Sequence, residues 1–137
     1  MGSGASVNDE NSDDIVKKIQ GGGVQQAIAL ELVVKTTVEN PTKEIKKANF
    51  ELLKAVLNLV HNGEGHIRMN ACCVIRNLST QKPNKHVLCE KNLGTLKALI
   101  RVLMEDTDTA RVHATCTLQN LATIDSIRYL LIDPALN

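Results

Sequence analysis

Apolar residues recur at helical spacing along most of the chain. This pattern predicts helices over residues 15–20, 24–38, 42–61, 65–80, 85–91, 95–105, 109–123 and 125–132. Breakers separate them, namely the glycines at 21–23, Asn40-Pro41, the segment 62–65, a loop containing Pro83, and Asp133-Pro134. The sequence therefore predicts an all-α fold.

One sequence segment occurs twice in similar form. Residues 66–80 read HIRMNACCVIRNLST and residues 109–123 read TARVHATCTLQNLAT, at a shift of 43 residues. The identical pairs are Arg68/Arg111, Ala71/Ala114, Cys73/Cys116, Asn77/Asn120, Leu78/Leu121 and Thr80/Thr123. A fixed period of this size is typical of stacked helical repeats, which bury their apolar faces against their neighbours.

The repeated unit resembles the armadillo family. Residues 94–103 are similar to the family's glycine-led second helix, and residues 114–122 to its third helix, which ends in Asn-Leu-Ala. Asn84-Lys85 and Glu90 match the first helix, with about two extra residues before Gly94, and 125–132 resembles the first helix of a further, incomplete unit. The resemblance extends over 84–132 and 52–80, and weakens upstream. It implies a right-handed α-solenoid of three-helix repeats.

The predicted organisation is a disordered N-terminal tail over 1–13 and an armadillo-like helical repeat domain over 14–137. The domain holds two full repeats, 41–80 and 83–123, with partial repeats at both ends. Two alignments of the first part stay open. In one, 24–38 is a third helix and 42–61 fuses a first and a second; in the other, 24–38 is a second helix and 42–61 a third. We prefer the former because the latter leaves helix 65–80 without its partners.

Composition supports helices and narrows the function. With one Phe, one Tyr and no Trp, the core must be aliphatic, which favours stacked helices over a β-sandwich. A net charge of +1 gives no reason to expect nucleic acid as a partner. No motif of nucleophile, phosphate loop or paired acids is present, so we expect neither an enzyme nor a cofactor.

The four cysteines lie within helical patterns, and two are adjacent, which indicates a reducing, cytoplasmic compartment rather than a disulfide framework. His86-x-x-Cys89 has the spacing of metal ligands on one short helix. Because no second close pair accompanies it, we predict no metal site and interpret the cysteines as small buried apolar residues.

The resemblance also implies a binding surface. In armadillo proteins the third helices line a concave groove, where an Asn near each helix C-terminus bonds the main chain of an extended peptide; here these are Asn77 and Asn120. A carboxamide suits this role because it both donates and accepts hydrogen bonds. The alternative is that each Asn only caps its helix and supports the adjoining turn.

Nuclear-import receptors of the family place a Trp one turn before that Asn, where this chain has Cys73 and Cys116. Without the aromatic slots, recognition of basic signals through cation–π contacts is not expected. Helical spacing from the two asparagines adds Asn70, Val74, His113 and Thr117 as groove-facing candidates. Because these side chains are neutral, the predicted surface suits a hydrophobic or mixed helix or a peptide. The predicted partner-binding residues are Asn70, Cys73, Val74, Asn77, His113, Cys116, Thr117 and Asn120. The predicted function is a non-enzymatic module for protein–protein interaction.

Two alternative functions stay open. Met1-Gly2 with Ser6 fits the acceptor for N-myristoylation at Gly2, which would make the chain an adaptor at a membrane, although the same start is also a common remnant of cloning. One myristoyl chain gives only weak attachment to a membrane. The other alternative is self-association, because helices 24–38 and 125–132 would expose apolar strips at the two ends of a short stack.

Overall fold

The computed structural model describes residues 12–39, 50–90 and 92–132, and the prediction of an all-α fold is confirmed for them. The helices are α1 (Ser12–Gly21), α2 (Gly23–Glu39), α3 (Phe50–Asn62), α4 (Gly65–Leu78), α5 (Lys82–Leu88), α6 (Thr95–Glu105), α7 (Asp108–Leu121) and α8 (Asp125–Leu131). The prediction for 95–105 has the observed bounds of α6, and most other ends differ by one to three residues.

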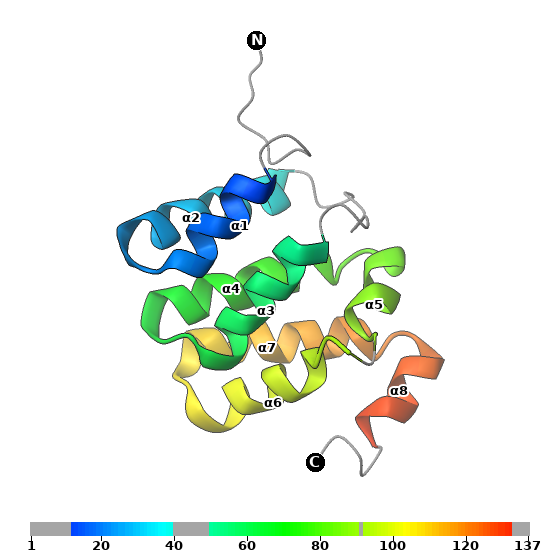
Figure 1. The fold of residues 1–137 in the computed structure, drawn as a ribbon. Helices are drawn as coiled ribbons and strands as arrows, with labels where there is room; N and C mark the ends of the chain where they lie inside the picture. The colour runs from blue at the N-terminus through cyan, green and yellow to red at the C-terminus, as the bar shows by residue number, and fades with distance from the viewer. Residues whose placement is uncertain (1–11, 40–49, 91, 133–137) are drawn as a thin grey trace.

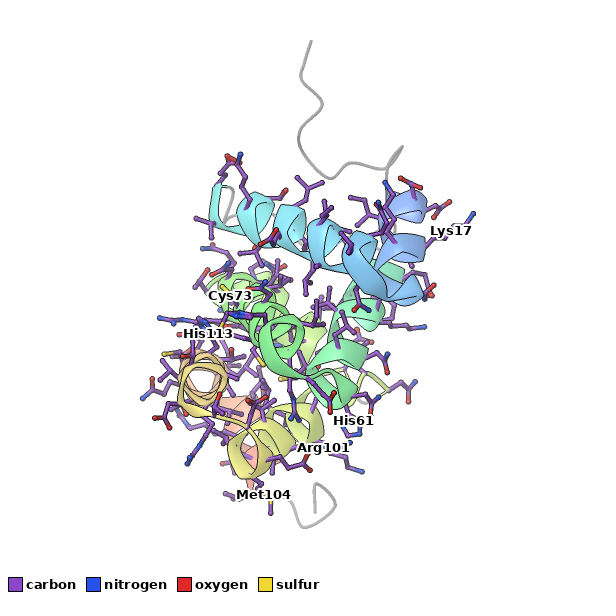
Figure 2. The ribbon with its side chains drawn as sticks, turned by 90° about the vertical axis from the view of Figure 1, so that its left-hand side faces the viewer. Lys17, His61, Cys73, Arg101, Met104 and His113 are labelled. Atoms are coloured by element: carbon purple, nitrogen blue, oxygen red, sulfur yellow. The ribbon has the colours of Figure 1, made fainter. Side chains whose placement is uncertain are left out.

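The long helices form two layers (Figures 1 and 2). In one layer α1 packs against α3 and α3 against α6; in the other α2 packs against α4 and α4 against α7. Each layer is joined to the other through the pairs α1–α2, α3–α4 and α6–α7. Helix α2 thus stacks on α4 as α4 stacks on α7.

The helix pair α3–α4 lies in the middle of the stack. This position is reflected in the burial of residues that are equivalent at the 43-residue shift. Val60 and Ile75 are fully buried, whereas Leu103 and Leu118, their equivalents 43 residues later, are half-exposed on α6 and α7. A residue that faces both neighbours in the middle of a stack has only one neighbour at its end. The core is aliphatic, as the composition predicted.

The tight turn between α3 and α4 depends on Gly63. Its backbone N–H donates to the carbonyl oxygen of Leu59 at 2.8 Å, and a Cβ at this position would lie 2.4 Å from the same oxygen. Only glycine allows so close an approach without a shift of the backbone. The turn thereby places the beginning of α4 beside the end of α3.

Three sequence predictions need correction or fall outside the described residues. The expected loop around Pro83 is wrong: Pro83 lies in the first turn of α5, where a fixed φ and a missing N–H are harmless. The expected tail 1–13 overlaps α1, which begins at Ser12; residues 1–11, with Gly2, lie outside the described part. Residues 42–49 of the expected helix 42–61 also lie outside it, and α3 begins at Phe50.

Candidate functional site

Six of the predicted partner-binding residues are half-buried and lie at matching positions on two stacked helices. Helix α4 carries Asn70, Cys73 and Asn77, and α7 carries their equivalents His113, Cys116 and Asn120. We call these six residues the α4/α7 row. The shift of 43 residues therefore preserves partial exposure at all three positions and residue type at two of them, Cys73/Cys116 and Asn77/Asn120. A side view shows Cys73 and His113 on one side of the molecule, and His61 and Arg101 on the other (Figure 2).

The other two predicted residues are placed wrongly. Val74 is 2% exposed and Thr117 is 0% exposed, so neither reaches a surface where a partner could contact it. Thr117 Oγ1 donates to the carbonyl oxygen of His113, one turn earlier in the same helix. These positions lie on the side of the helices that packs inside the stack, which helical spacing measured from Asn alone did not distinguish.

The two asparagines bridge neighbouring helices of their layer. Asn77 Nδ2 donates to Thr37 Oγ1 of α2 at 3.1 Å, and Asn120 Nδ2 donates to Ser79 Oγ, just after α4, at 3.0 Å. The Oδ1 atoms of both side chains accept no hydrogen bond from the residues that the structure describes. The two donors thus hold neighbouring helices of the layer together.

A third side-chain contact joins α4 to α7. Arg76 Nη1 of α4 lies 3.2 Å from His113 Nδ1 of α7. Because a guanidinium only donates, Nδ1 must be the acceptor, and the imidazole must be neutral. Burial, and then the Arg76 charge, lower the pKa of His113 below its ordinary value.

This contact predicts a pH dependence of stability. Above pH 6.5, the ordinary histidine pKa, His113 is neutral in both the folded and the unfolded chain. As pH falls below it, the unfolded chain binds the proton first, so the free energy of unfolding decreases until the lower folded pKa is passed. Urea unfolding at pH 7.5 and pH 5.5 should show a smaller decrease for His113→Gln than for the wild type. Equal decreases of the free energy of unfolding in the two proteins would contradict a role of His113 in this pH dependence.

Three of the cysteines, Cys72, Cys73 and Cys89, lack the features of reactive thiols, and Cys72 is fully buried. Burial raises the pKa of Cys72 to about 12 and that of Cys89 to about 11. Burial also raises the pKa of Cys73, which Arg76 and a hydrogen bond from Asn77 partly offset. Since the thiolate is the nucleophile, none of these three is activated. Within the described residues, no group of His, Cys, Asp and Glu side chains could hold a metal ion.

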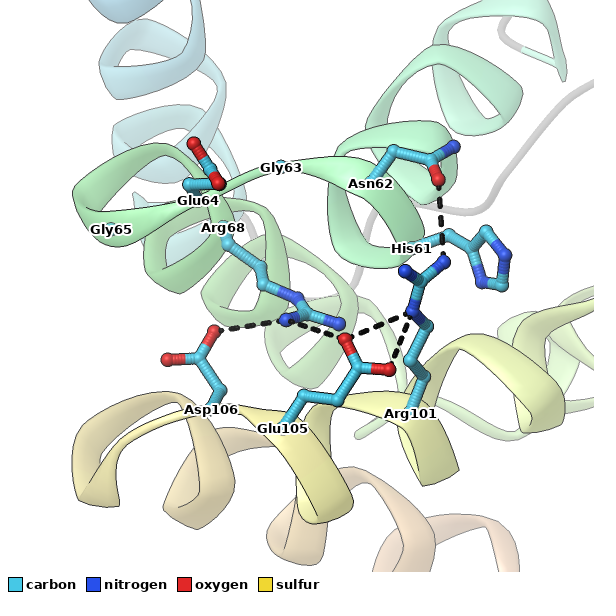
Figure 3. Close-up of a pocket in the computed structure, with 9 residues that line it drawn as sticks. All are labelled: His61, Asn62, Gly63, Glu64, Gly65, Arg68, Arg101, Glu105 and Asp106. Atoms are coloured by element: carbon cyan, nitrogen blue, oxygen red, sulfur yellow. Dashed lines mark hydrogen bonds and ion pairs between the residues drawn. The ribbon is translucent and has the colours of Figure 1, made fainter.

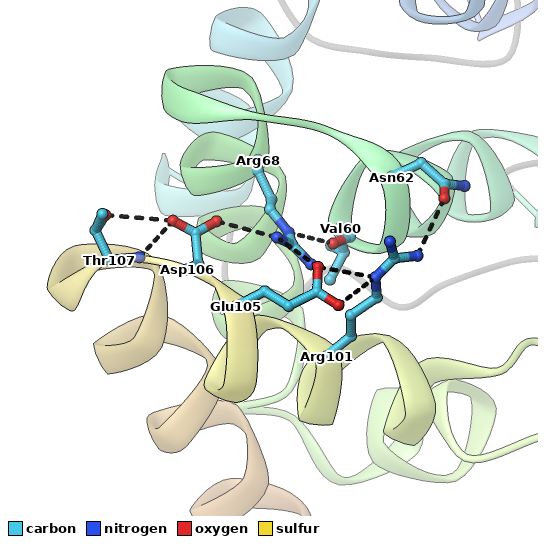
Figure 4. A network of polar contacts seen from close by, with 7 residues as sticks. All are labelled: Val60, Asn62, Arg68, Arg101, Glu105, Asp106 and Thr107. Atoms are coloured by element: carbon cyan, nitrogen blue, oxygen red, sulfur yellow. Dashed lines mark hydrogen bonds and ion pairs between the residues drawn. The ribbon is translucent and has the colours of Figure 1, made fainter.

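A charge network around the buried Arg68, between α3–α4 and α6, was not predicted from the sequence. Arg68, which is 6% exposed, donates from Nε to the carbonyl oxygen of Val60 at 2.8 Å (Figure 4). Its Nη1 lies 3.4 Å from Asp106 and 3.9 Å from Glu105. Glu105 also accepts from Arg101 Nε at 2.9 Å, while Asp106 accepts from the backbone N–H of Thr107 before α7. The network therefore connects the middle of the stack to its last helix pair.

The hollow at this network, about 330 Å³ in volume, is lined by charged groups of both signs (Figure 3). Two guanidinium groups, Arg68 and Arg101, face three carboxylates, Glu64, Glu105 and Asp106. The carboxylates would repel an anion, and the guanidiniums would repel a cation. We therefore assign this hollow to the structural network rather than to a ligand.

Comparison with known proteins does not assign the chain to a family. It matches no protein-family model, no curated protein and no solved structure. Among the helices described, none has the length and apolar character needed to span a membrane.

Proposed function

We propose that the chain is an armadillo-type stack that acts as a protein-interaction module, with the α4/α7 row as its binding surface. The stacking of equivalent helices supports the first part of this proposal: α2 on α4 and α4 on α7 in one layer, α1 on α3 and α3 on α6 in the other. The row supports the second, because it repeats the same three half-exposed positions on adjacent helices.

The observation that carries the proposal is the state of the two carboxamides. Each Nδ2 is already bonded within the stack, which fixes the plane of the side chain. Each Oδ1 is left as an acceptor, one helix apart from the other. Backbone N–H groups of an extended peptide, or of the first turn of a helix, are the donors that suit such a pair.

The remaining residues of the row define the partner further. Cys73 and Cys116 offer weakly polar contacts, and Asn70 is neutral. Beside the row, Arg76 Nη1 donates to the neutral His113 imidazole and keeps its positive charge. The row itself favours a partner with apolar or neutral side chains, and main-chain contacts supply most of the polar recognition.

Substituting both asparagines tests the proposal. A peptide selected from a random library against the wild type should bind the Asn77→Ala/Asn120→Ala variant about tenfold or more weakly, because two hydrogen bonds worth roughly 1 kcal/mol each are lost. Fluorescence polarisation measures the affinity, and circular dichroism checks that the variant is folded. Lys17→Ala, on the opposite layer, is the control. Equal binding by the wild type and the double variant would remove the row from the interface.

A second candidate function, self-association, is favoured by apolar side chains at both ends of the stack. Val24 and Ile28 of α2 are 73% and 55% exposed, and Tyr129 and Ile132 near α8 are 73% and 77% exposed. Light scattering should then show a mass that rises with concentration and falls for Ile28→Glu. A monomer mass at every concentration would contradict self-association and leave the α4/α7 row unaffected.

A further inference from the structure

A second hollow of about 380 Å³ lies between α3 and α6, in the layer opposite to the α4/α7 row. Its apolar part is formed by Leu57, Leu93 and Ala98, and its charged part by Lys54 and Lys97. We call it the α3/α6 groove. Its volume is at the lower end of the range for small-ligand sites, roughly 300–1,000 Å³, so it fits one residue rather than a long segment.

The charge of this groove is one-sided, unlike that of the neighbouring hollow at Arg68. None of the residues that line it carries a carboxylate. Lys54 is paired at the surface with Glu51 at 3.3 Å, whereas Lys97 is exposed and forms no ion pair with the described residues. The groove therefore has an unneutralised ammonium group next to an apolar surface.

The charge network described above orients a further donor at the groove. Arg101 Nη1 donates to Asn62 Oδ1 at 3.4 Å, so Asn62 must present Nδ2 to its other neighbour. Asn62 Nδ2 donates to Asn58 Oδ1 at 2.8 Å. Asn58, which lines the groove, is thus left with its Nδ2 hydrogens, which no acceptor among the described residues takes.

The beginning of α6 adds backbone N–H groups to the hydrogen-bond donors at the groove. Its N-cap is Gly94, at φ 69°, which has no side chain to accept from the first N–H groups of the helix. A Cβ at Gly94 would have no atom within 4 Å, so there is open space beside this end. The backbone therefore favours an acceptor here, in agreement with the Lys97 and Asn58 side chains.

From these contacts we propose that the α3/α6 groove binds the C-terminal carboxylate of a partner peptide that ends in an aliphatic residue. The ammonium of Lys97 and the amide of Asn58 offer only donors, which suit a carboxylate rather than an amide. The half-exposed Leu93 receives the aliphatic side chain, and the largely buried Leu57 and Ala98 line the same hollow. A terminal carboxylate is joined to the Cα that also bears this side chain, which matches a groove the size of one residue.

Titration with blocked amino acids, followed by ¹H–¹⁵N NMR of the full chain, tests the proposal. N-acetyl-leucine should give saturable shifts at the amides of Asn58, Gly94 and Lys97, with a dissociation constant on the order of millimolar for so small a ligand. N-acetyl-leucinamide, which lacks the carboxylate, should bind about tenfold more weakly. N-acetyl-glycine, which lacks the aliphatic side chain, should also bind about tenfold more weakly.

Protein variants complete the experiment. Lys97→Ala should weaken N-acetyl-leucine about fivefold or more, because the charged partner of the carboxylate is lost. Lys17→Ala, which removes an exposed lysine from α1, should leave binding unchanged. Equal affinity for N-acetyl-leucinamide, unchanged affinity in Lys97→Ala, or no saturable shift would each overturn the proposal. N-acetyl-leucyl-aspartamide, with a carboxylate only on its side chain, would also overturn it by binding as well as N-acetyl-leucine.

Discussion

Replacing Arg68 by alanine is expected to lower the free energy of unfolding by about 3–5 kcal/mol, the usual cost of removing one partner of a buried ion pair. Arg68 Nε satisfies the Val60 carbonyl, and Nη1 lies beside Asp106, whose side chain is 11% exposed. Without the guanidinium, the carbonyl is left unpaired and the carboxylate keeps only the Thr107 side of its contacts. In a domain with a total stability of 5–15 kcal/mol, this loss is large.

The repeat supplies a matched control for this substitution. Arg111 is the equivalent of Arg68 in the second copy, but it lies exposed on α7 at the end of the stack. Arg111→Ala should change the free energy of unfolding by less than about 0.5 kcal/mol, as exposed substitutions usually do. Urea unfolding of both variants measures the difference. Similar stabilities for the two variants would show that the Arg68 network contributes little.

Replacing Ile75 by alanine is expected to cost about 2–5 kcal/mol, the range found for large-to-small substitutions in a packed core. Ile75 is fully buried in α4, between α2 and α7, and helix packing on both sides hinders collapse of the cavity. Its equivalent Leu118 is only half-buried, so Leu118→Ala should cost about half as much. Chemical denaturation of the two variants compares them. A larger loss for Leu118→Ala would contradict the central position of α4.

Most of the helices could be predicted from the sequence because local signals define them. Apolar spacing defines α6 and α7 well, and Gly94 and Asp106 stand directly beside the two ends of α6. The prediction of a loop at Pro83 was wrong because proline breaks a helix interior but is favoured in a helix's first turn. Without the neighbouring helix, the sequence did not show which case applied.

The candidate site was less predictable because it depends on contacts between repeats. Helical spacing groups Val74 and Thr117 with the asparagines, but only the position of the adjoining helices shows that both are buried. Likewise, Arg68 and Arg111 are identical in sequence, and their different burial follows from their place in the stack. The bond of Asn77 to Thr37 joins residues 40 positions apart, which no local pattern indicates.

The bridging carboxamides have a consequence for how successive helices would respond to a bound partner. When Oδ1 accepts a hydrogen bond, the amide becomes more polarised and its Nδ2 becomes a stronger donor. A partner on Asn77 would thereby strengthen the bond to Thr37, and a partner on Asn120 the bond to Ser79. A partner that bonds to both carboxamides would therefore tighten the two side-chain contacts that join α2, α4 and α7.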